Sequence, residues 1–251
     1  VGCTIVVAVF LFVLIGCFYT PYDPNGMDGS AKNLAPGIKH LFGTDNFGRD
    51  ILSRVMEGSR TTFFVALCTV LIGSIIGVII GALTGYYGGW LDEVIMRVND
   101  VITSFPSILL ALIFVSVLGI GTFNIILALG IIFIPSFARV VRSEFITYRQ
   151  RDFVLNAKLM GASDLRIMFL YILPNTFPVL LSSILIGFNN AVLAEAGMSF
   201  LGLGVQPPDA SLGRMLSESQ AYLFQAPWYA LAPGCLIVLA VLGIGMVGDE
   251  I

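Results

Sequence analysis

The two longest runs without a charged residue extend from Thr61 to Leu91 and from Val101 to Ala138. A helix needs about 20 apolar residues to cross the hydrocarbon core of a bilayer, so each run is long enough to span a membrane. Hydrophobic residues make up 57% of the chain and charged residues 12%, about half the charged share of a soluble domain. This composition excludes a water-soluble enzyme. The formal net charge of -3 also provides no basic surface for nucleic acid.

The apolar runs predict an all-α, polytopic membrane protein with about six transmembrane helices in one permease-like domain, 1–251. The expected helices cover residues 1–19, 61–91, 101–118, 123–142, 177–195 and 228–248. Polar segments 20–60 and 203–226 are expected outside the cell, and segment 143–175 inside it. Six Lys or Arg residues lie between Arg139 and Arg166. The preference of basic residues for the cytoplasmic side favours this orientation, although the basic residues on the two sides nearly balance.

Gly73, Gly77, Gly81 and Gly85 repeat at a spacing of four residues in the second expected helix. This spacing places them on nearly one face, where two helix backbones can approach closely. The glycines therefore predict a helix-packing surface, either inside this bundle or between subunits. Prolines at positions 106, 135 and 233 predict kinks or helix starts in other spans.

Motifs that would support catalysis are absent from the sequence. No Gly-Lys dipeptide occurs, so the chain lacks the phosphate-binding loop of P-loop ATPases, and no HExxH or GxSxG motif is present. The four cysteines stand alone in apolar runs, and no metal-binding spacing is found. The chain is therefore expected to be no enzyme. Cys17 ends a stretch resembling a lipoprotein processing site, which is an alternative that predicts a lipid on this residue.

Glu195, preceded by Asn189 and Asn190, is the one candidate for an ionisable group inside a span. At a rise of 1.5 Å per residue, Glu195 lies about 27 Å along a helix that starts near Phe177, close to the far membrane interface. It is interpreted as an interfacial or capping carboxylate, or as part of a translocation path together with the two asparagines. Coupling to protons or sodium has little support from the sequence.

The segment from Arg149 to Asn175 predicts a charged, elbow-shaped element between two spans. Two short helices are expected, broken at Gly161 and restarted with Ser163 as N-cap, and Pro174 begins the next span. Short helices can transmit a displacement from a soluble partner, whereas a loose loop cannot.

This elbow resembles the cytoplasmic coupling loop of ABC-importer permeases, known as the EAA motif. Ala157, Gly161 and Leu173-Pro174 match that motif, whereas Leu155 and Asn156 replace its Glu and first Ala. Segments 40–60, 103–106 and 198–208 resemble signatures of the peptide/nickel importer permeases, specifically the second permease of the heterodimeric pair. Segment 247–250 resembles the start of the C-terminal tail of that family.

The resemblance implies a type I ABC importer permease fold with cytoplasmic coupling helices, in the bacterial cytoplasmic (inner) membrane. The implied partners, besides membrane lipid, are a homologous second permease, two cytoplasmic ABC ATPases and an extracytoplasmic substrate-binding protein. No cofactor is expected on this chain, since the partner ATPases would use ATP and Mg²⁺. The implied ATPase-coupling residues are Asn156, Ala157, Gly161, Ala162, Ser163, Asp164, Leu165 and Pro174.

The expected substrates are di- or oligopeptides, or nickel or a nickel chelate. The alternative is a self-contained secondary carrier or channel, which would transport without ATP.

Overall fold

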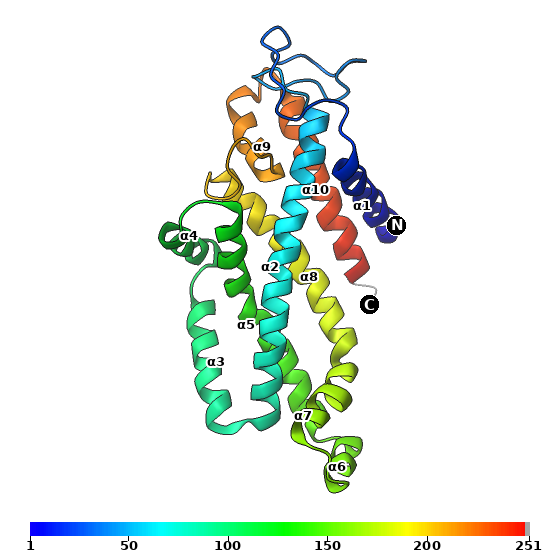
Figure 1. The fold of residues 1–251 in the computed structure, drawn as a ribbon, viewed down its shortest axis with the longest axis vertical. Helices are drawn as coiled ribbons and strands as arrows, with labels where there is room; N and C mark the ends of the chain where they lie inside the picture. Colours follow the sequence, from blue (N-terminus) through cyan, green and yellow to red (C-terminus); the bar gives the residue numbers. More distant parts are fainter. Residues whose placement is uncertain (249–251) are drawn as a thin grey trace.

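The computed structural model describes residues 1–248. All secondary-structure elements assigned within these residues are helices or helical turns (Figure 1). Asp249 and Glu250, which resemble part of a C-terminal tail, lie outside the described residues. The elements in chain order are α1 (Gly2–Phe18), α2 (Ile51–Tyr87), α3 (Gly89–Ser104), α4 (Ser107–Leu118), α5 (Thr122–Arg149), α6 (Asp152–Leu159), α7 (Asp164–Arg166), the π-helical turn η1 (Ile167–Ile172), α8 (Leu173–Phe200), α9 (Leu212–Ser219), the 3₁₀ turn η2 (Gln220–Tyr222) and α10 (Pro227–Gly248).

Helix α2 begins ten residues before the expected start of the second span. Asp50 is its N-cap, and the Asp50 side chain accepts a hydrogen bond from the backbone N–H of Ser53 at 2.8 Å. The segment 51–60, expected as part of a loop, is therefore the first part of this 37-residue helix. The charged residues there misled the prediction because a helix can continue beyond the hydrocarbon core. The helix ends at Gly88, whose φ of +67° suits glycine.

The glycine stripe of α2 packs directly on α5. A Cβ added at Gly77 would lie 2.6 Å from Phe137 Cβ, and one added at Gly81 would lie 2.5 Å from the carbonyl oxygen of Ala138. Gly73 and Gly85 face the same helix at similar distances. A side chain at these positions would separate the helices, so the stripe allows backbone contact within this chain.

The third expected span, 101–118, is not one continuous helix. Helices α3 and α4 meet at an angle of 94°. Phe105 has extended backbone angles (φ -91°, ψ 142°), as expected for a residue that precedes proline, and α4 starts directly after Pro106. Phe105 and Pro106 therefore form a break between two helices, and Thr103 and Ser104 end α3.

Four helical segments are long and apolar enough to cross a membrane: α2, α5, the continuous helix Asp164–Phe200, and α10. A fifth crossing requires α3 and α4 to be counted together, and α1, with 17 residues, is a shorter apolar helix. Pro135 and Pro233 lie inside helices that continue past them. The six expected spans thus correspond to four long helices, one broken pair and one short helix.

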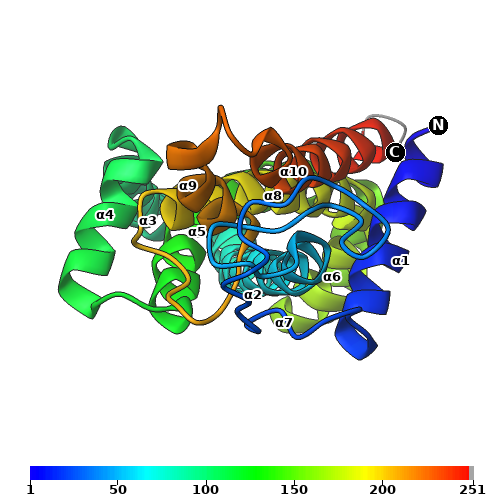
Figure 2. The same ribbon diagram turned by 90° about the horizontal axis from the view of Figure 1, so that it is seen from above.

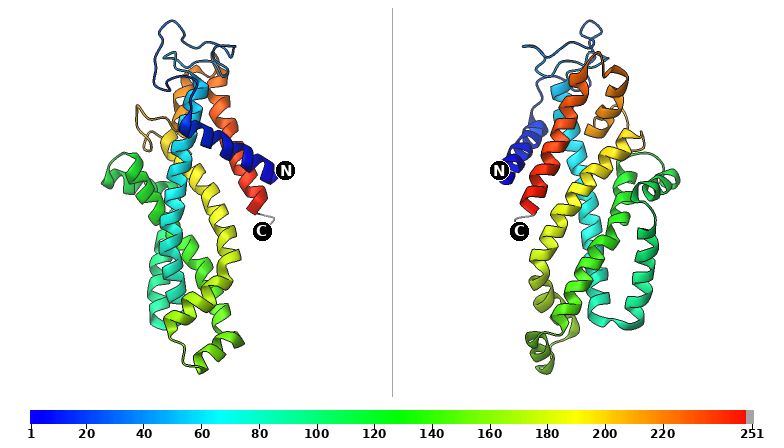
Figure 3. Two further views of the ribbon diagram at one scale, coloured as in Figure 1. Left: turned by 45° about the vertical axis from the view of Figure 1, so that its right-hand side comes forward. Right: turned by 180° about the vertical axis from the view of Figure 1, so that it is seen from behind.

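Different elements lie at the two ends and on the two flanks of the bundle. Helices α6 and α7 form one end, whereas the helix-free segment 19–50 and α9 form the opposite end (Figure 1). From above, α3 and α4 lie on one flank and α1 on the other (Figure 2). Helix α1 crosses beside α10 (Figure 3), where a Cβ on Gly2 would lie 2.7 Å from Met246 Cβ. The main apolar core lies between α2, α5, α8 and α10.

Candidate functional site

The elbow is a compact turn whose backbone is closed by hydrogen bonds. The N–H of Gly161 donates to the carbonyl of Lys158 at 3.1 Å, and the N–H of Ala162 donates to the carbonyl of Ala157 at 3.0 Å. This pairing is the Schellman arrangement that ends many helices at a left-handed glycine, and Gly161 has a φ of +81°. The glycine break is therefore where the sequence placed it. Ser163 occupies the N-cap position of α7, but its side chain makes no capping hydrogen bond.

The elbow is attached to the bundle at two polar contacts. The Tyr86 hydroxyl donates to Asp164 Oδ1 at 2.7 Å, which links α2 to α7. The Arg149 guanidinium at the end of α5 donates to the carbonyl oxygen of Tyr86 at 2.8 Å. Val154 and Ala157 on α6 are buried, so the elbow also has an apolar contact with the bundle. These contacts fasten the elbow to α2 and to the end of α5.

The tip of the elbow presents apolar side chains away from the bundle. Leu159 is 86% exposed, Met160 is 89% exposed, and Leu165 is also exposed. Figure 1 shows this tip at the extreme end of the molecule. Clustered exposed apolar residues beyond the bundle are typical of a surface that binds another protein.

Seven of the eight sequence-predicted coupling residues divide into two groups. Ala157 is buried and Ala162 half-buried, and Asp164 is exposed but forms the bond to Tyr86, so these residues hold the elbow in place. Asn156, Gly161, Ser163 and Leu165 are exposed around the tip. Pro174 lies where the π-helical turn η1 passes into α8, inside the continuous helical segment Asp164–Phe200.

A cavity of about 520 Å³ lies where the α3–α4 break meets α5 and α8, a size typical of small-molecule sites. Its lining is mixed, with several aliphatic side chains and a few hydroxyl and amide groups. The lining residues are Ile102, Thr103, Phe105, Ser107, Ile108, Ala111, Leu129, Ile132, Phe133, Ser136, Asn190, Leu193, Ala194 and Met198. The break at Pro106 interrupts the helical backbone beside this cavity. Membrane proteins tolerate non-helical backbone at membrane depth where that backbone lines a cavity.

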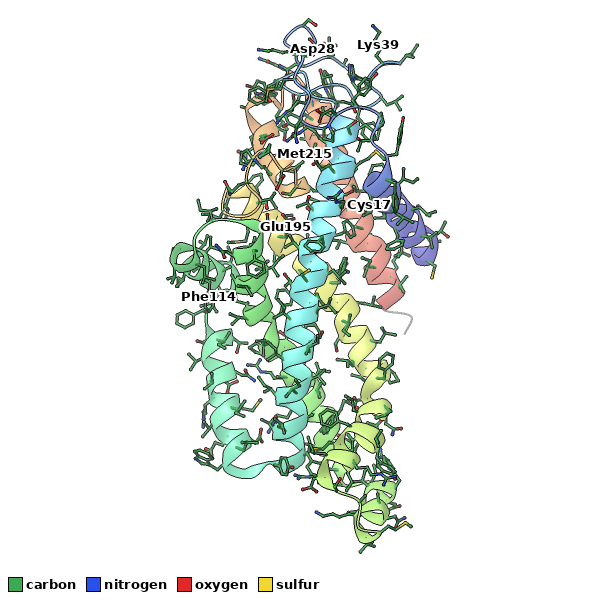
Figure 4. The ribbon with its side chains drawn as sticks, in the orientation of Figure 1. Cys17, Asp28, Lys39, Phe114, Glu195 and Met215 are labelled. Atoms are coloured by element: carbon green, nitrogen blue, oxygen red, sulfur yellow. The ribbon has the colours of Figure 1, made fainter. Side chains whose placement is uncertain are left out.

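Of the three residues predicted for a translocation path, Asn190 lines this cavity. Asn189 instead donates from its amide to the carbonyl of Val241 on α10, at 3.1 Å. Glu195 is completely buried, and its Oε1 accepts a hydrogen bond from Ser199 at 2.6 Å. Glu195, labelled on α8 in Figure 4, is thus enclosed by protein and is not among the residues that line the cavity. Its interfacial or capping role stays a prediction. The sequence gives the position of Glu195 along the axis of α8, but that position alone does not indicate which side of the helix Glu195 occupies.

The sequence contained no indication that Thr103 and Ser136 supply polar groups to a cavity. Their signal was weak, because single hydroxyl residues are common in membrane helices. Ser136 does follow Leu129, Ile132 and Phe133 at helical spacing, but periodicity alone cannot distinguish a cavity-facing side of a helix from a lipid-facing one.

An ion-pair network closes the opposite end of the molecule. Glu218 on α9 accepts hydrogen bonds from Arg49 at 3.1 Å, from Tyr229 at 2.8 Å and from Arg214 at 2.9 Å. Arg54 on α2 lies 3.4 Å from the same carboxylate. The network joins the helix-free segment 19–50 to α2, α9 and α10.

The environment of Glu218 shifts its pKa in two directions. Partial burial raises the pKa of this carboxyl, but the hydrogen bond from Tyr229 and the charges of Arg54 and Arg49 more than offset burial. The pKa therefore lies below its ordinary value. The sequence identified these arginines only as charges outside the spans and gave no sign of their shared partner.

The sequence of residues 73–249 matches the family of binding-protein-dependent transport system inner membrane components. The chain belongs to this family. The match includes the elbow, both walls of the cavity and the α2 glycine stripe. It confirms the predicted class, a permease of an ABC-type importer in a bacterial inner membrane.

Individual relatives cover nearly the whole chain. A dipeptide transport system permease of Alkalihalophilus pseudofirmus is 40% identical over 98% of this chain and 79% of its own length. A glutathione transport system permease of Escherichia coli is 41% identical over 96% of this chain and 81% of its own. A putative peptide permease of Brucella suis is 39% identical over 99% and 83%, respectively.

Among solved structures, the inward-facing MetNI methionine ABC transporter has a similar fold. Its matching chain superposes with a TM-score of 0.64 at 21% identity, covering 78% of this chain and 94% of that one. This likeness confirms the predicted all-α permease fold.

Proposed function

We propose that this permease carries short peptides across the inner membrane as one half of a heterodimeric translocation path. Support for the substrate class comes from its relatives, which include permeases for dipeptides and for glutathione, itself a small peptide. The cavity of about 520 Å³ is large enough for such a molecule and offers both aliphatic and hydrogen-bonding groups. The nickel alternative stays a prediction.

In this proposal the elbow receives force from a cytoplasmic ATPase subunit. The observation that carries this role is the pair of exposed apolar residues, Leu159 and Met160, on a tip that is attached to α2. The chain itself would bind no nucleotide, and ATP and Mg²⁺ would be used by two such ATPases. A homologous permease would complete the path, and an extracytoplasmic binding protein would deliver peptide to the end that carries α9.

Helix α8 supplies a direct mechanical connection between the elbow and the cavity. The helical segment from Asp164 to Phe200 is continuous and 37 residues long, and it begins in the elbow. Asn190, Leu193 and Met198 near its far end line the cavity. Because a helix transmits displacement along its axis, movement of the elbow would shift one wall of the cavity. Asn156, Gly161 and Leu165 would lie at or beside the ATPase contact.

The test is reconstitution of the complete transporter in proteoliposomes, with uptake of di- to pentapeptides, glutathione and nickel measured separately. We expect ATP-dependent uptake of peptides. Replacing both Leu159 and Met160 with Asp should abolish uptake and the stimulation of ATPase activity, while the chain still inserts. Trp90→Asp, which alters an exposed apolar residue outside the elbow, is the matched control and should retain more activity. Peptide uptake without ATP, or normal uptake by the double variant, would contradict the proposal.

A further inference from the structure

A second, apolar groove lies on the flank of the bundle where α1 crosses α2 and α10. Its volume is about 340 Å³. The groove is lined by apolar residues of α1, α2, α8 and α10, among them Phe10, Cys17, Phe64 and Leu67, and by Arg60. Arg60 is the only charged residue in this lining. An amphipathic molecule would match one cation at the edge of an otherwise apolar groove.

The depth of Arg60 in the membrane follows from its position in α2. It is the last charged residue before the charge-free run that begins at Thr61, so it marks one boundary of the hydrocarbon core. Cys17, near the end of α1, lines the same groove, and Figure 4 shows Cys17 toward the end of the molecule that carries α9. From Arg60, the groove continues along α2 toward the membrane centre past Phe64 and Leu67.

Arg60 makes no ion pair or side-chain hydrogen bond with any residue from 1 to 248, the part of the chain that the structure describes. Glu57 lies one helical turn earlier but forms no ion pair with it. An unpaired arginine at the hydrocarbon boundary is costly unless its charge reaches water or an anion. Arginine presents a planar set of donors that suits phosphate, and its apolar stem packs along hydrocarbon.

We propose that this groove binds an anionic phospholipid, with the phosphate on Arg60 and one acyl chain along Phe10, Phe64 and Leu67. An acyl chain that extends inward from a phosphate at the boundary of the hydrocarbon core would run in the same direction as the groove. An anionic headgroup is preferred because the ammonium of a zwitterionic headgroup competes with Arg60 for the phosphate. Under the orientation given above the lipid belongs to the outer leaflet. The binding itself does not depend on the transported substrate.

The test uses the complete transporter in vesicles, with Cys3, Cys68 and Cys235 replaced by Ala and a bimane fluorophore on Cys17. Two vesicle preparations are compared, and both consist mainly of phosphatidylcholine. In one, a tenth of the lipid is brominated phosphatidylglycerol; in the other, a tenth is brominated phosphatidylcholine. Bromine on the acyl chain quenches bimane at contact. We expect brominated phosphatidylglycerol to quench at least twofold more strongly. Arg60→Gln should abolish this difference, Arg60→Lys should retain part of it, and Lys39→Gln, which removes an equal charge from segment 19–50, should preserve it.

Equal quenching by the two lipids with Arg60 present would overturn the proposal. Weak quenching by both lipids would also overturn it, because it would mean that another protein surface, such as the second permease, covers the groove. Native mass spectrometry of the unlabelled complex gives a second measurement, in which Arg60→Gln should lower the retained phosphatidylglycerol. Peptide uptake is not part of either readout, so failure here leaves the proposed transport function unaffected, and the converse also holds.

Discussion

Gly161 shows how a single backbone conformation shapes the elbow. Its φ of +81° is in the left-handed region, and an added Cβ would meet no atom within 4 Å. Glycine is therefore needed for its conformation rather than for space. We expect Gly161→Ala to destabilise the elbow by about 1–2 kcal/mol and to weaken the coupling of ATP hydrolysis to uptake.

Gly197 provides the matched control for this prediction. It also has open space around it, but it lies inside α8 with ordinary helical geometry. Alanine there should stabilise the helix by about 0.5–1 kcal/mol. The check is thermal unfolding of both variants in detergent, together with ATPase stimulation. A Gly161→Ala protein as stable and as well coupled as Gly197→Ala would show that the left-handed residue is unimportant.

The Tyr86 hydroxyl donates the side-chain hydrogen bond that links α2 to Asp164. Tyr86→Phe keeps the buried ring and removes this bond, at a cost of about 0.5–1.5 kcal/mol. We expect normal insertion and assembly but a lower ratio of peptide transported to ATP hydrolysed. Tyr87→Phe changes the exposed neighbour and should leave that ratio unchanged. An equal ratio in the two variants would contradict the role assigned to this bond.

At the scale of elements, the contact between α2 and α5 organises the bundle. Gly81 is the tightest position, since an added Cβ would lie 2.5 Å from the Ala138 carbonyl oxygen. Gly81→Ala should force the helices apart and cost about 1–3 kcal/mol, as overpacked cores do. Ile79→Ala alters an exposed side chain of the same helix and should change the melting temperature less. Equal melting temperatures for the two variants would mean that the helices can separate without cost.

The sequence identified this glycine face but left its partner open, because small residues at this spacing serve contacts within a chain as well as between chains. The choice depended on α5, whose Phe137 and Ala138 face the stripe. The α3–α4 break shows a similar limit. Pro106 predicted a kink or a helix start, whereas the angle of 94° reflects how the two helices pack against the rest of the bundle.

At the scale of the whole molecule, the Glu218 network connects four parts of the chain at the end opposite the elbow. Because its pKa is lowered in the folded state, Glu218 stabilises the fold fully above its ordinary pKa of 4.5. This stabilisation is lost as the pH falls through the lower pKa of the folded state. We expect the melting temperature of the native protein to exceed that of Glu218→Gln at pH 7, and the difference to shrink below pH 4.5.

Subtracting the Glu218→Gln curve removes the titration of the other carboxyl groups, which both proteins share. A difference between the two proteins that stays constant from pH 7 to pH 3 would show that the ionised Glu218 does not stabilise this end. Arg54→Met should lower the stability at pH 7 as well, because it removes one of the cations that face the carboxylate.

The sequence by itself determined the membrane location, the helical class and the helix break at Gly161, because hydrocarbon thickness and backbone sterics act on local stretches of residues. It also identified the elbow by its resemblance to known coupling loops. Only the tertiary structure decided that Asn190 lines the cavity while Asn189 and Glu195 do not, and that Arg49, Arg54 and Glu218 meet. Which side of a helix faces a cavity, and which distant charges pair, depends on how the helices pack, since no local pattern records the neighbours of a side chain.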